Sequence, residues 1–168
     1  MIYQVGALQA FCDSYGVTLQ HMKLHGAFYN TACVTPALAD AVLDGLQAVN
    51  PNIAAMVLSG SYIAKEAERR GIPVIQEVFA DRGYTDEGTL VPRIEPGAFI
   101  KDPQEALERV LMMVTEGKVV TNTGNTIDIV ADSVCVHGDN PEAIAFTNYI
   151  REGLTKAGVT VANFQNRK

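Results

Sequence analysis

The order of apolar and polar positions along the chain predicts strands and helices in alternation. Residues 53–58 (IAAMVL) form an unbroken apolar run, which is typical of a strand buried on both faces. Residues 102–116 instead repeat their apolar side chains with a helical period, which is typical of a helix with one buried face. Thr35 and Pro36 mark the start of another helix, as its cap and its first-turn residue. The expected strands cover 18–24, 53–58, 72–79, 133–136 and 159–161, and the strand at 133–136 should be buried. The expected helices cover 3–15, 35–49, 61–70, 102–116 and 141–156, and Gly16 should end the first of them. A β-hairpin covers 118–130 and should turn near Thr123–Asn125.

This order predicts an α/β fold. Strand, polar loop and helix repeat along the chain, which implies parallel strands joined by right-handed crossovers. Periodicity alone does not separate an open doubly wound sheet from a closed barrel. Neither GxGxxG nor GxxxxGK[ST] occurs, so the sequence supports neither a dinucleotide site nor a P-loop. The first expected helix has no strand before it, so we expect part of the sheet to be missing and one strand edge to be left open.

Composition narrows the class of protein. The 168 residues are 48% apolar and 19% charged, which is typical of a globular domain with a real core. The net charge of −6 argues against a nucleic-acid partner, which would require a basic face. No apolar run approaches the length of a membrane span, so we expect a cytoplasmic protein with no membrane partner. Cys12, Cys33 and Cys135 are expected to be reduced thiols.

Polar side chains follow each expected strand. Because the carboxyl ends of parallel strands form the ligand-binding face of an α/β fold, these side chains should meet at one rim. A long polar loop within 77–93 contributes most of the charge there, and its composition is poor for a linker. The rim residues are Lys23 and His25, then Ser59 and Ser61, then Asp81 and Arg82, and finally His137 and Asp139, with Asn30 and Arg93 in the nearby loops.

These residue types point to acid–base chemistry on an anionic ligand. His25 or His137 can move protons near neutral pH, and Asp81 or Asp139 can orient the ring or act as base. Lys23, Arg82 and Arg93 can hold a carboxylate or a phosphate. The Ser59–Ser61 turn offers N–H groups to an anion, or a helix cap, and Asn30 is either a ligand group or a loop side chain that bonds its own backbone. Residue types allow a divalent metal, but their spacing does not support one.

Three motifs together resemble a known family. Lys23 with HGAFYN (25–30) looks like the KPHGALYN motif of the LamB/YcsF family, although Leu24 and Phe28 replace its proline and leucine. EVFADRGYTDEGTLVPR (77–93) and VCVHGDNPEA (134–143) look like two further motifs of that family. The resemblance runs in order along essentially the whole chain.

The resemblance implies the C-terminal part of a distorted (β/α) barrel similar to that of the glycoside hydrolase/deacetylase superfamily. It also implies the A subunit of an ATP-dependent 5-oxoprolinase, which works with two partner subunits to open the lactam of 5-oxo-L-proline to L-glutamate while hydrolysing ATP. Family members carry further motifs of the DLNCDxGE, ACGFHAGD and GAHP types, none of which occurs here. We therefore expect one partial barrel domain over 1–168 that lacks the family's N-terminal portion.

Several functions remain alternatives at this point. The superfamily resemblance also fits a metal-dependent amidase or deacetylase. A substrate-binding subunit without catalysis would bind 5-oxoproline and show no turnover. An inactive truncated relative would do neither, and it could form a homo-oligomer that covers the open barrel edge.

Overall fold

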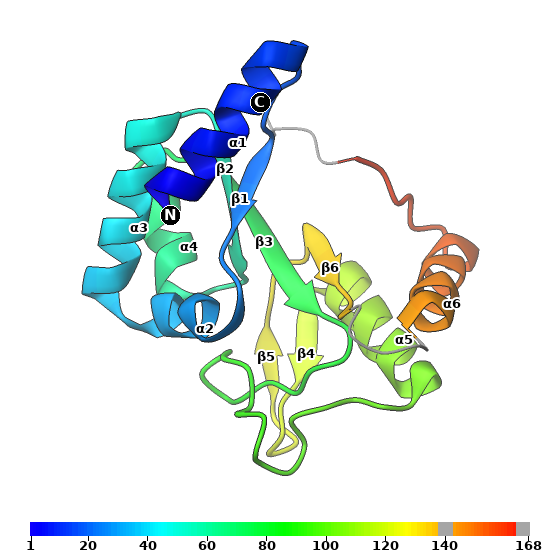
Figure 1. Cartoon of the computed structure of the whole chain (residues 1–168). Coiled ribbons are helices and arrows are strands. Elements are labelled where there is room, and N and C mark those ends of the chain that lie inside the picture. The colour runs from blue at the N-terminus through cyan, green and yellow to red at the C-terminus, as the bar shows by residue number, and fades with distance from the viewer. Residues whose placement is uncertain (138–142, 164–168) are drawn as a thin grey trace. The chain divides into compact units, whose positions relative to one another are not determined.

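The computed structural model describes residues 1–137 and 143–163, and the chain divides into two compact units, Met1–Gln76 and Glu77–Lys168 (Figure 1). Strand β3 (Val74–Phe79) crosses the boundary and contributes to both. Its first residues belong to the unit that contains β1 (His21–Lys23) and β2 (Ala54–Leu58). Its last residues pair with β6 (Ser133–Cys135) in the second unit.

The strands of the main sheet are parallel where their registers are defined. His21 lies opposite Ala54 in the β1–β2 pair, and Glu77 lies opposite Ser133 in the β3–β6 pair. The strand order is β1-β2-β3-β6. A separate antiparallel hairpin consists of β4 (Lys118–Val120) and β5 (Thr126–Asp128). The expected α/β fold, with parallel strands and one small hairpin, is confirmed.

The first unit follows the apolar pattern closely. Ala54, Val57 and Leu58 of β2 are buried, as the unbroken apolar run requires. Ser61 caps α4 and accepts a hydrogen bond from the Ala64 N–H at 3.4 Å, so the cap expected there is present. Thr35 occupies the cap position of α3 but makes no side-chain cap hydrogen bond. The helices of this unit are α1 (Ile2–Tyr15), α2 (Gly26–Val34), α3 (Pro36–Val49) and α4 (Tyr62–Arg69).

Helix α1 differs from the others in how little of it is buried. Gly16, with φ of 64°, ends it in a left-handed cap as expected. Of its side chains only Val5 is buried, and Phe11 remains 65% exposed, so the apolar spacing predicted the helix correctly but not its burial. No single helix within 1–137 and 143–163 is long and apolar enough to cross a membrane, and α2 with α3, which pass that test together, are bent by 112°.

The second unit consists of β3's end, the hairpin, β6 and two packed helices. Asp102 caps α5 (Pro103–Leu111) by accepting from the Gln104 N–H at 3.0 Å. The last turn of the expected helix is a π-helix, Met112–Glu116, which ends at Gly117. Helix α6 (Ala143–Lys156) packs on α5, and the core between them contains Ala106, Val110, Ile150 and Leu154.

Three expectations about local structure were wrong. The HGAFYN segment was expected to be a loop, but Gly26–Val34 form α2, with Tyr29 and Cys33 on its buried face. Residues 159–161 form no strand; the Val159 N–H instead bonds the Leu154 carbonyl and closes the end of α6. Strand β6 is half-buried rather than buried. Pro141, expected to open the last helix, lies outside the described residues.

Candidate active site

Two of the expected site residues meet at the ends of β3 and β6. Asp81 follows β3, and His137 follows β6, its parallel partner. The Asp81 Oδ2 atom lies 2.7 Å from His137 Nδ1, within hydrogen-bond distance. This pairing fixes which ring nitrogen faces the carboxylate, so Nε2 is the nitrogen through which His137 can exchange a proton.

The surroundings of this pair hold it in place. The Phe79 ring stacks on the His137 ring, with centroids 5.7 Å apart. The Ile100 N–H donates to the Asp81 carbonyl at 3.0 Å. Asp81 Oδ1 is buried and has no hydrogen-bond partner among the described residues. The two side chains are 20% and 27% exposed, so both are open to a ligand on part of their surface.

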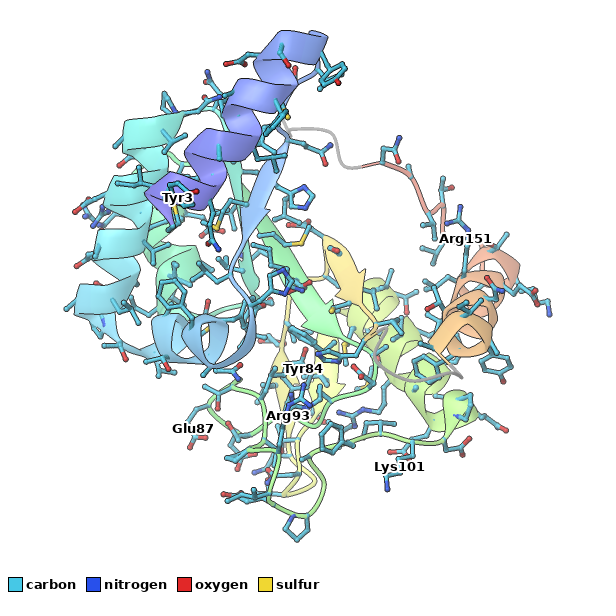
Figure 2. All side chains as sticks on the ribbon, viewed as in Figure 1. Tyr3, Tyr84, Glu87, Arg93, Lys101 and Arg151 are labelled. Carbon is cyan, nitrogen blue, oxygen red and sulfur yellow. The ribbon has the colours of Figure 1, made fainter. Side chains whose placement is uncertain are left out.

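The two arginines expected to bind an anion surround one aromatic ring. The Arg82 and Arg93 guanidinium carbons lie 5.1 and 5.4 Å from the Phe99 centroid. Arg82 is buried and donates to the carbonyls of Val91 (2.6 Å) and Ala98 (2.9 Å), and burial lowers its pKa. Arg93 is exposed, and Figure 2 shows it in the same loop as Tyr84. Arg82 therefore holds the loop together, whereas Arg93 is accessible to an anion.

A cleft of about 780 Å³ adjoins Asp81. Such a volume lies within the usual range for small-molecule sites. Lys101, labelled in Figure 2 on the segment that enters α5, lines it and has no ion-pair partner within 1–137 and 143–163. Its other lining residues are mainly apolar or aromatic, and include Phe99, Ile100, Ala145, Phe146 and Tyr149.

The remaining expected residues belong to the first unit. The Lys23 Nζ atom lies 5.6 Å from the Tyr29 centroid, and Lys23 and His25 line a second cleft, of about 450 Å³. His25 is exposed at the cap position of α2, and Asn30 is exposed on that helix. Ser59 is buried, and Ser61 donates to the Leu58 carbonyl at 2.6 Å while it caps α4. Their binding roles stay predictions.

Asp139, the remaining expected site residue, lies outside the described residues. Within 1–137 and 143–163 no three His, Cys, Asp or Glu side chains group closely enough to hold a metal ion. The three cysteines form no disulfide.

Sequence reasoning missed the aromatic part of the site. Phe79 and Phe99 lie in the expected strand and the following loop, where an apolar residue carries no signal of function. The only available hint in the sequence was that Phe99 is a large apolar residue within a polar segment. In the structure its side chain is 39% exposed. Tyr149 lies on the outer face of α6 and could not be assigned to a cleft without the packing of that helix.

Comparison with known proteins identifies the family. A Fusobacterium nucleatum protein named as the A subunit of 5-oxoprolinase is 57% identical over 96% of this chain, and one of Pyrococcus abyssi with the same name is 47% identical over 96%. This chain spans 63% of the length of each of these two relatives. The crystal structure of a lactam utilization protein from Thermus thermophilus matches 97% of this chain and 65% of its own chain, with a TM-score of 0.87 and 40% identity. This likeness confirms the expected fold, part of a distorted (β/α) barrel with parallel strands. Residues 1–168 match the LamB/YcsF family throughout, and the chain belongs to that family.

Proposed function

We propose that this chain is the A subunit of an ATP-dependent 5-oxoprolinase, which hydrolyses 5-oxo-L-proline to L-glutamate together with two other subunits. The observation that carries the proposal is the Asp81–His137 pair at the carboxyl ends of two parallel strands, with Asp81 also lining a cleft. The names of the relatives and of the solved structure support a cyclic amide as substrate. We further propose that residues 1–168 form part of one barrel domain, and that the complex works in the cytoplasm, where ATP is supplied.

Hydrolysis of a lactam requires activation of the carbonyl group and two proton transfers. A lactam carbonyl is a poor electrophile, and a phosphoryl group from ATP on its oxygen would make attack by water feasible. Water then adds to the ring carbonyl carbon, and the ring C–N bond breaks as the nitrogen takes a proton to become the amine. A second water then cleaves the resulting acyl phosphate into the side-chain carboxylate of glutamate and inorganic phosphate. The protein must therefore take a proton from water and supply one to nitrogen.

The described residues include groups for proton transfer and for binding the anionic parts of the substrate. His137 Nε2 is placed to exchange protons, and the Asp81 carboxylate orients the ring through Nδ1. In the cleft, Lys101 supplies a cation for the carboxylate of the substrate, and Tyr149 offers an aromatic surface for its methylene groups. Arg93 is the accessible guanidinium for a phosphoryl oxygen. The catalytic roles of His25 and Asp139 and the binding roles of Lys23, Asn30, Ser59 and Ser61 stay proposals.

The test is reconstitution. The chain is combined with the other two subunits, ATP and 5-oxoproline, and glutamate and ADP are measured. We expect both products to depend on this chain. ADP and glutamate at the same rate without it would contradict the proposal, and so would 5-oxoproline turnover that needs no ATP.

A further inference from the structure

The Asp86 carboxylate is bound by three side chains of the β4–β5 turn. Its Oδ1 atom accepts hydrogen bonds from the Thr121 and Thr123 hydroxyls, the latter at 2.7 Å. Its Oδ2 atom accepts from Asn125 Nδ2 at 3.0 Å. These donors, Thr121 first, hold the pKa of Asp86 below its usual range. The arrangement joins the long loop after β3 to a hairpin that lies more than thirty positions away in the sequence.

The same turn also holds Tyr84. The Asn122 N–H donates to the Tyr84 carbonyl at 2.8 Å. The Tyr84 ring is fully buried, and its hydroxyl accepts from the Phe79 N–H at 2.8 Å. Phe79 in turn stacks on His137. Continuous contacts therefore lead from the hairpin turn to the imidazole of the candidate site.

Asp86 is exposed and does not line the cleft, so contact with substrate does not explain its bonds. Its neighbour Glu87 carries the same charge, is exposed (Figure 2) and has no hydrogen bond within the described ranges 1–137 and 143–163. Asp86 and Glu87 both carry a negative charge, but among the described residues only Asp86 is bonded to the hairpin. Comparing variants of the two residues therefore distinguishes the effect of losing these bonds from the effect of losing a charge in the loop.

We infer that Asp86 is a positioning residue: by fastening the loop after β3 to the turn at 121–125, it fixes the geometry of the Asp81–His137 pair. The kinetic consequence rests on the proposed function, whereas the geometric one does not. Misplacement of a catalytic group by about 1 Å can cost a hundredfold in rate, so we expect loss of the Asp86 contacts to lower kcat by about 10- to 100-fold with little change in KM.

The hydrogen-bond pattern suggests a specific rescue. Asp86→Asn removes the negative charge that the Thr121 and Thr123 hydroxyls bond. Its new amide nitrogen also faces Asn125 Nδ2, a contact between two donors that only rotation of the Asn125 amide would relieve. Adding Asn125→Asp restores a donor–acceptor pair with the roles reversed, while the amide oxygen at position 86 still accepts from Thr121 and Thr123. Thr123→Val, which removes one donor and keeps the shape, is a milder variant in case Asp86→Asn does not fold.

The experiment reads the site directly, by the ¹³C and ¹⁵N chemical shifts of the His137 ring in the whole chain, assigned with His137→Gln. We expect D86N to move these shifts, T123V to move them less, D86N/N125D to restore them, and Glu87→Gln to leave them unchanged. A destabilising control in the first unit, Leu43→Ala, should leave them unchanged as well, because loss of stability alone does not move the ring.

The outcomes separate the two proposals. If the His137 shifts are the same in D86N, T123V and wild type, the positioning role is wrong, whatever the activity. If D86N moves the shifts and the swap restores them, the positioning role stands. In that case, wild-type chain that forms no glutamate in the reconstituted complex would refute the proposed function alone.

Discussion

Each unit of the molecule holds a carboxylate that accepts three hydrogen bonds, Glu66 in the first and Asp86 in the second, but the two carboxylates have different partners. In the first unit, Glu66 accepts from Arg69 Nε at 2.7 Å, and from Arg69 Nη2 and Arg70 Nε at 2.6 Å each. Arg70 continues to Asp40 and Asp44 of α3, so charges join two neighbouring helices. In the second unit, neutral hydroxyl and amide groups surround Asp86 and join a loop to a hairpin.

The difference shows how each unit keeps its shape. The first unit consists of regular strands and helices whose apolar faces already define the packing, and its ion pairs add to a fold that the apolar pattern specifies. The loop after β3 has no such pattern. It is held by directional polar bonds, those of Arg82 among them, and by close backbone contacts, and that construction allows it to present Asp81 and Arg93 at defined positions.

The largest expected effect is at Gly83. A Cβ atom on this buried residue would lie 2.0 Å from the Gly97 carbonyl oxygen, so backbone would have to move. We expect Gly83→Ala to lower the free energy of unfolding by at least about 3 kcal/mol, measured by urea denaturation.

The matched variant in the first unit is Gly45→Ala. Its Cβ would meet the end of the Met1 side chain, which can turn away, and would lie 3.2 Å from Ile2 Cγ1, which must shift slightly. Alanine also favours the helix. We expect a change of less than about 1 kcal/mol. Equal losses in the two variants would show that the loop is no more tightly constrained than the helix.

The next effect is at Tyr84. Tyr84→Phe would remove the hydroxyl that accepts from the buried Phe79 N–H, which should cost about 1–3 kcal/mol. Tyr3→Phe, on an exposed residue of α1 labelled in Figure 2, is the control and should cost nothing measurable. A Tyr84→Phe protein as stable as wild type would mean that the hydroxyl does not hold the loop.

A smaller effect is expected in the cleft beside Asp81. Tyr149→Ala removes an exposed ring that lines the cleft, and should raise the KM for 5-oxoproline about tenfold at unchanged kcat, since an aromatic contact contributes about 1 kcal/mol or more. Arg151→Ala, on the same helix but outside this cleft, should change neither parameter. Steady-state kinetics of the reconstituted complex measure both.

The smallest effect depends on pH. The Arg69 hydrogen bonds, followed by that of Arg70, lower the pKa of Glu66 from 4.5 to about 2. The ionised form is favoured by folding, so its contribution is full above pH 4.5 and is lost as the pH falls towards 2. Glu66→Gln should flatten the stability curve in this window, as measured by denaturant midpoints at several pH values. If the slope of stability against pH between 2 and 4.5 is the same in Glu66→Gln and wild type, Glu66 does not contribute to acid unfolding.

Salt sharpens the comparison between the two carboxylates. Added salt should weaken the exposed arginine pairs of the first unit and leave the neutral donors of Asp86 nearly unaffected. In the wild-type protein, the part of the pH dependence of stability that comes from Glu66 should therefore be smaller at high salt, whereas the part that comes from Asp86 should not change. Each part is the difference between wild type and Glu66→Gln or Asp86→Asn.

The sequence predicted regular elements far better than the contacts of the site. The unbroken apolar run of β2, Gly16 at the end of α1 and the Thr123–Asn125 turn depend on neighbouring residues, so local patterns were enough. Helix α2 was missed because its buried face is short and its motif contains glycine and asparagine. Asp86 was visible as a charge, but its partners lie more than thirty residues away and become neighbours only when the hairpin folds. For the same reason the His137–Asp81 pairing could be proposed only as one of several.

The central claim is that the Asp81–His137 pair performs the proton transfers of lactam cleavage. The most direct measurement is 5-oxoproline-dependent glutamate formation by the reconstituted complex that contains Asp81→Asn or His137→Gln. Because general acid–base catalysis contributes about 10²- to 10⁴-fold, we predict a fall of that size in kcat for each variant, with KM little changed. Wild-type turnover in either variant would contradict the account.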